Sequence, residues 1–186
     1  MQVHNTPIEG LVVITPHIFE DNRGYFYESY KKSLFDEIIT PVNFVQDNQS
    51  FSSKGTLRGL HFQKNPFAQG KLVRVLQGAV LDVAVDIRKG SPTYGQYHSE
   101  MLSDKNHKQF WVPAGFAHGF LTLEDDTIFV YKCTNFYNKE SEGGLLHNDP
   151  ILNIDWGEIN PILSEKDMIY PDFNEFISPF NYDETK

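Results

Sequence analysis

The sequence contains little cysteine and no long apolar runs. Among its 186 residues Cys133 is the one cysteine, so no disulfide can form within the chain. The longest apolar runs, such as residues 10–14, are far too short to cross a bilayer. Residues 1–5 have neither the basic region nor the apolar core of a secretory signal. These features predict a soluble cytoplasmic protein that does not bind membranes.

Positive charge is also scarce. Lys and Arg number 16 against 25 Asp and Glu, which gives a formal net charge of -9 at pH 7. Proteins that bind nucleic acids or anionic membranes need basic surface to neutralise phosphates. The composition therefore argues against a nucleic-acid partner. Any phosphate that this protein binds must be held by a few local cations.

Alternation of apolar and polar residues with a period of two dominates the sequence. The clearest example is 80–87, where Asp82 and Asp86 share one face and the other face is apolar, a pattern that predicts a strand with one wet or functional face. Similar runs, separated by Gly, Pro, Asn or Ser, occur at 25–30, 44–51, 57–62, 71–76, 97–102 and 128–134. Many short strands with such turns predict an all-β sandwich or barrel.

Helical spacing is confined to a short stretch. Residues 31–39 carry apolar side chains at helical intervals and Pro41 follows, so we expect one short helix there. After Trp156 the pattern loosens around several prolines, which predicts short helices and loops that wrap the barrel. The length and the 40% hydrophobic content fit one domain, residues 1–186, with 173–186 as a C-terminal tail to which we assign no role.

Two histidine motifs are similar to the two halves of a cupin barrel site. The second, residues 113–120, keeps the pattern Pro-x-Gly-x-x-His and ends around His118. In the first, His61-Phe62-Gln63 stands where a metal cupin carries His-x-His and a nearby carboxylate. A tight divalent site usually needs at least three donors. We therefore expect neither a metal nor a cofactor, and His61 as a proton-transfer base.

A longer set of fragments resembles the dTDP-4-dehydrorhamnose 3,5-epimerase family. The fragments follow the family's order over residues 3–172, at 21–28, 45–48, 57–63, 68–74, 111–120, 131–134 and 163–167. The resemblance implies a double-stranded β-helix, a jelly-roll, cupin-like barrel with a few short peripheral helices. It also implies a homodimer in which the N-terminal strand crosses to the partner.

The resemblance implies a reaction as well. The family acts on dTDP-4-dehydro-6-deoxy-D-glucose, inverts C3 and C5, and gives dTDP-4-dehydro-L-rhamnose for dTDP-L-rhamnose biosynthesis. Both carbons lie next to the 4-keto group, so loss of either proton gives an enolate. Such an isomerase needs a base on one face of the sugar, an acid on the other, and a cation near the enolate oxygen.

Four side chains match these catalytic roles in the family pattern. His61 is the candidate base, since an imidazole titrates near neutrality, and Asp167 is the carboxylate that would orient it. Tyr131 is the candidate acid, and Lys71 the cation for the enolate oxygen or the diphosphate. Taken alone, each has a structural alternative: a core histidine, a turn-capping Asp167 beside Ser164, a packed tyrosine, and a lysine that reaches solvent.

The remaining candidates are substrate-binding residues implied by the resemblance. Arg23, Arg58 and Lys166 would contact the diphosphate, Tyr137 would stack on the thymine, and His118 would lie beside the sugar. Nucleotide or sugar contacts are expected from Glu28, Gln46, Asp47, Asn48 and Glu142. In the homodimer, Arg23 and Glu28 would complete the site of the partner.

Some alternatives stay open at this stage. His147-Asn148-Asp149 stands where the family pattern has Trp-Asn-Asp, which affects either the rim of the pocket or nothing. Asp82 and Asp86 could line the pocket or bind neighbouring strands. The rival functions are epimerisation at one carbon or of another nucleotide sugar, a metal-dependent cupin, and a sugar-binding barrel without catalysis.

Overall fold

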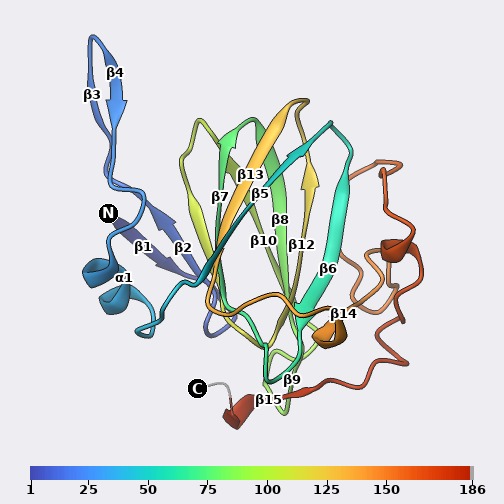
Figure 1. Cartoon of the computed structure of the whole chain (residues 1–186). Coiled ribbons are helices and arrows are strands. Elements are labelled where there is room, and N and C mark those ends of the chain that lie inside the picture. Colours follow the sequence, from blue (N-terminus) through green and yellow to red (C-terminus); the bar gives the residue numbers. More distant parts are fainter. Residues whose placement is uncertain (185–186) are drawn as a thin grey trace.

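The computed structural model describes residues 1–184, which form two facing antiparallel sheets (Figure 1). The first sheet has the order β1 (Gln2–Asn5), β2 (Val12–Thr15), β11 (Gln109–Val112), β7 (Lys71–Gln77), β13 (Thr127–Cys133), β5 (Gln46–Ser52). The second has the order β10 (Tyr97–Ser103), β8 (Ala79–Asp86), β12 (Phe116–Thr122), β6 (Leu57–Gln63), β14 (Glu142–Gly144). Together the sheets confirm the predicted all-β, cupin-like jelly roll.

The main core lies between the two sheets. Val73 and Phe129 of the first sheet pack with Val80, Ala84 and Phe120 of the second, because alternate residues of each strand point to the same side. The predicted strand over 80–87 is confirmed as β8, but its Asp82 and Asp86 are both 0% exposed. The face is therefore not wet, because it points to the interior of the barrel, whereas a functional role for this face stays a prediction.

A second core covers the outer side of the second sheet. Val83, Val85 and Ile87 pack there against Trp156 and Phe180 of the C-terminal part of the chain. That part runs along the outside of the β6 edge in Figure 1. It contains the short helices η1 (Lys139–Ser141), η2 (Lys166–Met168) and η3 (Tyr182–Glu184). Short helices and loops wrap the barrel here, as the sequence predicts.

The C-terminal tail is attached to the barrel. β15 (Phe180–Asn181) pairs in parallel with β9 (Arg88–Lys89), and Phe173 and Phe176 pack against the second core. The last two residues of the predicted tail, 185 and 186, lie outside the described residues. The tail thus has a structural role that the sequence did not predict.

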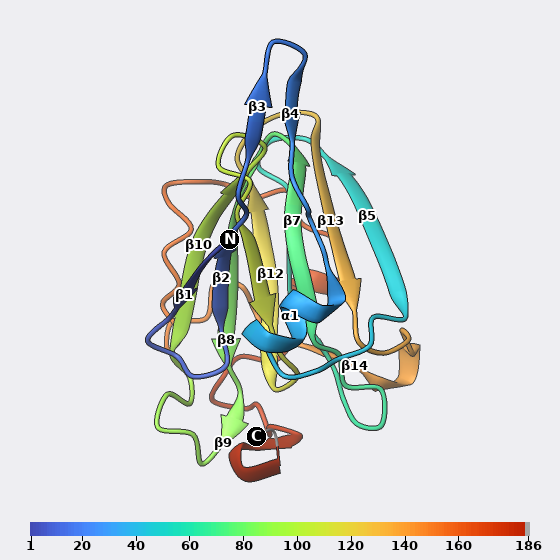
Figure 2. The ribbon, with the colours of Figure 1, turned by 90° about the vertical axis from the view of Figure 1, so that its left-hand side faces the viewer.

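The N-terminal part forms an arm and the predicted helix. β3 (Phe19–Asp21) and β4 (Gly24–Phe26) make a hairpin that stands away from the sheets, as Figure 2 shows from a second side. The strand expected at 25–30 is therefore shorter and ends at Phe26. The expected helix is α1 (Lys32–Ile38), whose Phe35 packs on the outer side of the first sheet. Among the described residues, no helix is long and apolar enough to span a membrane.

Candidate active site

A cleft of about 940 Å³ opens between the two sheets. This volume fits a nucleotide sugar, because ligand pockets commonly measure about 300–1,000 Å³. Except for Arg23, Glu28 and Asp47, every predicted site residue lines this cleft: His61, Asp167, Tyr131, Lys71, Gln46, Asn48, Arg58, His118, Tyr137, Glu142 and Lys166. Residues far apart in the sequence are thus brought together in one cavity.

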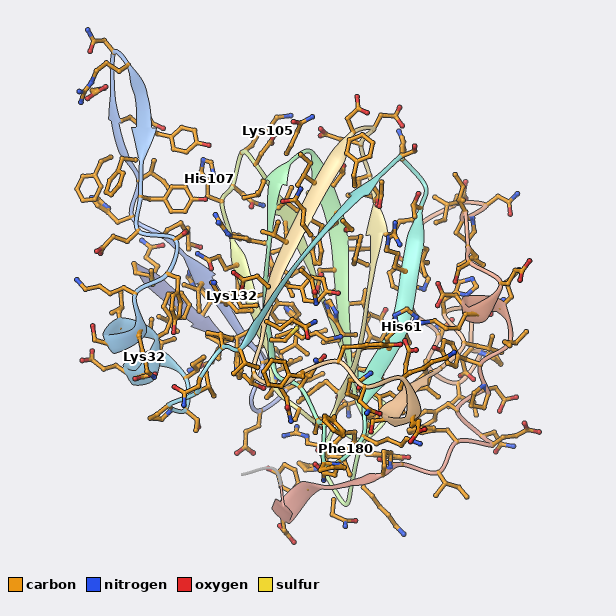
Figure 3. All side chains as sticks on the ribbon, viewed as in Figure 1. Lys32, His61, Lys105, His107, Lys132 and Phe180 are labelled. Atoms are coloured by element: carbon orange, nitrogen blue, oxygen red, sulfur yellow. The ribbon has the colours of Figure 1, made fainter. Side chains whose placement is uncertain are left out.

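One wall of the cleft carries a pair formed by His61 and Asp167. His61 lies on β6 (Figure 3), and Asp167 lies in η2, which packs beside that strand. The His61 Nε2 atom is 2.5 Å from Asp167 Oδ1. Ser164 Oγ donates to Asp167 Oδ2 at 2.9 Å, and the Asp167 amide donates back to Ser164 Oγ. Ser164 therefore caps the turn through the Asp167 amide, and the Asp167 carboxylate is held by the Ser164 hydroxyl while it contacts the imidazole.

The electrostatics of this pair favour a neutral imidazole beside an ionised carboxylate. Burial lowers the pKa of His61 more than the hydrogen bond and charge of Asp167 raise it. Burial acts to raise the pKa of Asp167, but the hydrogen bonds from His61 and Ser164 outweigh it and hold this pKa below its ordinary value. A neutral His61 that donates Nε2–H to Asp167 keeps its lone pair on Nδ1. Nδ1 is thus the atom that can accept a proton.

The opposite wall carries Lys71 and Tyr131. Lys71 lies on β7, on the same inward face as Val73. Tyr131 lies on the neighbouring strand β13, on the same inward face as Phe129. Lys71 Nζ is 5.9 Å from the centre of the Tyr131 ring. Burial raises the pKa of Tyr131, so the phenol keeps its proton. Burial also lowers the pKa of Lys71, while nearby acidic groups, including Asp82, act in the opposite direction.

A second histidine and carboxylate pair lies deeper in the cleft. His118 is the direct cross-strand neighbour of His61, and its Nε2 lies 2.8 Å and 3.0 Å from the two carboxylate oxygens of Asp82. Burial raises the pKa of Asp82, against the opposing effect of His118. The sequence left the role of Asp82 open. The sequence could have indicated that Asp82 is buried, because Asp82 shares one face of β8 with the core residues Val80 and Ala84.

Polar side chains surround the mouth of the cleft. Lys166 Nζ lies 2.5 Å from Glu142 Oε1, and the Tyr137 hydroxyl donates to Glu142 Oε2 at 3.1 Å. Gln46 Oε1 accepts from the Tyr137 amide at 3.0 Å. Gln63 and Gln69 are among the cleft residues that the sequence analysis did not select. The mouth can therefore offer cations, an aromatic ring and several amides to a ligand.

Asp47 lies outside the cleft, which corrects the prediction. Gln46 and Asn48 face the cleft, whereas Asp47 turns to the other side of β5 and pairs with Lys132 at 3.0 Å. The cause is the period-two geometry of a strand, in which adjacent residues point to opposite faces. Asp47 contributes to a smaller cavity of about 270 Å³ on that outer side.

Arg23 and Glu28 do not reach the cleft of their own chain. Arg23 lies at the exposed end of the β3–β4 hairpin and pairs with Asp21. The Glu28 Oε1 atom lies 3.6 Å from Lys31 Nζ. Figure 1 shows that the hairpin projects from the side of the barrel. Their expected contact with a partner's substrate stays a prediction.

Two further features of the sequence analysis concern metal ligands and residues 147–149, which differ from the family pattern. Within residues 1–184, no three His, Cys, Asp or Glu side chains are grouped so that they could hold a metal ion. His147 and Asp149 line a separate cavity. Asp149 Oδ1 accepts from the amides of Ile151 and Leu152, both at 2.8 Å. This segment therefore shapes the wrapping chain, and none of its three residues lines the cleft.

The fold and the cleft define a class: a cupin-like β-barrel protein whose side chains can exchange protons with a ligand from two facing walls. The particular family follows from comparison with known proteins. The profile of the dTDP-4-dehydrorhamnose 3,5-epimerase family matches residues 5–175. The chain belongs to this family.

Individual relatives agree with this assignment. The dTDP-4-dehydrorhamnose 3,5-epimerase of Shigella flexneri is 52% identical over 169 residues, which are 90% of this chain and 93% of that protein. A Legionella pneumophila epimerase solved with dTDP-4-keto-L-rhamnose has a TM-score of 0.92 and 49% identity, over 97% of this chain and 98% of that one. A 3'-monoepimerase from Streptomyces bikiniensis solved with dTDP-quinovose has a TM-score of 0.87 and 34% identity, over 91% and 86%.

Proposed function

We propose that this chain inverts C3 and C5 of dTDP-4-dehydro-6-deoxy-D-glucose and forms dTDP-4-dehydro-L-rhamnose in dTDP-L-rhamnose biosynthesis. The observation that carries the proposal is the placement of two proton-transfer groups on facing walls of one cleft. His61 with Asp167 stands on the β6 side, and Tyr131 with Lys71 stands on the β7 and β13 side. A planar enolate held between them can lose a proton to one wall and gain one from the other.

Each inversion takes two balanced steps. His61 Nδ1 accepts the proton from the carbon, and the electron pair of the broken C–H bond moves into the enolate, whose charge lies on the former 4-keto oxygen. Lys71 stabilises that charge. Tyr131 then donates its phenolic proton to the opposite face of the same carbon, and proton exchange with solvent restores both side chains.

The nucleotide part would lie across the mouth of the cleft. Arg58 and Lys166 supply local positive charge for the diphosphate, which suits a protein with few cations overall. Tyr137 offers an exposed ring for stacking on thymine, and Gln46, Asn48 and Glu142 offer hydrogen bonds. His118 would contact the sugar from the depth of the cleft.

The proposal includes one domain, a cytoplasmic location and a homodimer. β1 is exposed along its whole length, and Phe19 and Phe26 of the hairpin are also exposed, so the arm has apolar surface to bury against a second copy. In such a dimer Arg23 and Glu28 would reach the partner's cleft. Sedimentation analysis of wild-type protein and of a variant that lacks the hairpin residues 19–26 tests this, and a monomeric wild type contradicts it.

The experiment that tests the reaction is incubation of the 4-keto sugar nucleotide with the enzyme in deuterated water. We expect deuterium at both C3 and C5 together with inversion at both. The similarity to a 3'-monoepimerase keeps a second candidate, inversion at one carbon, and label at a single position would support it. A metal-dependent cupin would lose turnover after treatment with a chelator, whereas we expect no loss.

A further inference from the structure

Tyr170 lies beside the proton-transfer pair without lining the cleft. Its ring stands edge to face against the His61 ring, with centroids 5.6 Å apart and an interplanar angle of 64°. It follows η2 by two residues and therefore belongs to the segment that carries Asp167. Tyr170 thus touches the imidazole from the same segment as the carboxylate that contacts it.

A glycine makes room for this ring. Gly144 of β14 is the direct strand partner of His61. A Cβ atom at Gly144 would stand 2.6 Å from two ring atoms of Tyr170, a separation that real side chains do not tolerate. The Tyr170 ring therefore occupies a slot that exists because position 144 has no side chain.

Besides the Tyr170 ring, the segment is held by Lys166, whose Nζ atom lies 2.5 Å from Glu142 Oε1. Met168 and Ile169, which separate Asp167 from Tyr170, are 54% and 81% exposed. Asp167 is buried, Tyr170 is half-buried, and the next anchor is the bond from the Leu146 amide to the Pro171 carbonyl at 3.1 Å. The two side chains of this turn that contact His61 are thus Asp167 and Tyr170.

We propose that Tyr170 is a positioning residue, whose ring in the Gly144 slot keeps Asp167 in contact with His61. The inference rests on the proposed role of His61 as the base. Tyr170 acts through the orientation of the His61 and Asp167 pair, and the role depends on its ring and not on its hydroxyl.

The test compares Tyr170→Ala and Tyr170→Phe, each in the wild type and in Asp167→Asn. Because small misplacements of catalytic groups are costly, we expect Tyr170→Ala to lower kcat about tenfold, with KM nearly unchanged, and Tyr170→Phe to keep kcat. In Asp167→Asn, Tyr170→Ala should have almost no further effect, since residues that act as one unit are not additive. The same tenfold loss in both backgrounds, a full kcat in Tyr170→Ala, or an equal loss in Tyr170→Phe overturns the proposal.

Two further measurements separate this role from folding and from the reaction itself. Phe173→Ala is the matched control, since it removes a half-buried ring of the same segment that packs on Phe176 instead of His61. It should lower the unfolding temperature and keep kcat. Proton NMR without substrate should show the downfield resonance of the His61–Asp167 hydrogen bond in wild type and Tyr170→Phe, and its loss in Tyr170→Ala. If the wild type does not turn over, the proposed function fails, and this spectrum still decides the role of Tyr170.

Discussion

Two buried carboxylates on one face of β8 have different surroundings. Asp86 accepts from the Arg88 guanidinium at 2.8 Å and 2.9 Å and from the hydroxyls of Ser91 and Thr93 at 2.6 Å and 2.7 Å. Asp82, four residues earlier, has His118 as its hydrogen-bond partner. Both side chains are fully buried.

The neighbours of each carboxylate set its protonation and its role. Burial alone acts to raise the pKa of Asp86, but its donors outweigh burial and lower the pKa, which leaves a fixed anion that binds β8 to the following turn. Burial raises the pKa of Asp82, because one histidine does not offset the loss of water. The Asp86 region therefore stabilises the fold, whereas the cleft region keeps groups that can exchange protons.

The largest effect that we expect is on activity. His61→Asn should abolish deuterium exchange at both C3 and C5, because a positioned base contributes about 10²- to 10⁴-fold. The exchange is followed by NMR in deuterated water. His98→Asn is the matched control, since His98 lies on β10 outside the cleft. This variant should catalyse deuterium exchange at C3 and C5 at the wild-type rate. Continued exchange at one carbon in His61→Asn would reveal a second base.

The next effect separates stability from activity. Asp86→Asn should lower the free energy of unfolding by about 3–5 kcal/mol, since it leaves the buried Arg88 without its counterion, while kcat of the folded protein stays unchanged. Urea denaturation measures the loss. Asp86→Asn with Arg88→Met should recover part of it. A loss no larger than the roughly 1 kcal/mol of an average substitution would contradict the structural role of this cluster.

Asp82→Asn should cost less stability than Asp86→Asn. Because burial already disfavours the charged form of Asp82, a neutral amide that still accepts from His118 should cost roughly 1–2 kcal/mol. The same urea measurement compares the two variants directly. Equal losses would show that Asp82 is also a fixed structural anion, and the contrast between the two regions would disappear.

The smallest effect concerns pH. His61 must be neutral to act as a base, so activity is lost as pH falls through its pKa, which burial lowers below the ordinary value of about 6.5. We expect kcat/KM to stay level from pH 8 to about 6.5 and to fall at lower pH. In Asp167→Asn the acid limb should move to still lower pH, because Asp167 raises the pKa of His61. An acid limb above pH 6.5 would contradict this electrostatic account.

The strands could be predicted from the sequence, but their surroundings could not. Alternation over 80–87 identifies β8, yet its outer face is covered by Trp156 and Phe180, about seventy or more residues later in the chain, and no local pattern encodes that contact. The same alternation could have excluded Asp47 from the cleft, because Gln46 and Asn48 point to the opposite face of the strand from Asp47.

Site residues depended on contacts between distant parts of the chain. His61 and Asp167 are 106 residues apart, so the resemblance to a family, and not their spacing, predicted the pair. The pair of Asp82 with His118 and the slot of Tyr170 over Gly144 were not predicted. Both depend on strand register, which aligns His118 and Gly144 with His61.

The central claim, that protons leave on one wall and return from the other, is tested most directly with Tyr131→Phe. An NMR time course in deuterated water compares label uptake with epimer formation in wild type and variant. His61 can still remove a proton in the variant, but it can return one only to the original face, so the substrate should gain deuterium and keep its configuration. Wild-type enzyme should gain deuterium with inversion. Inversion of C5 by Tyr131→Phe at the wild-type rate would contradict the account.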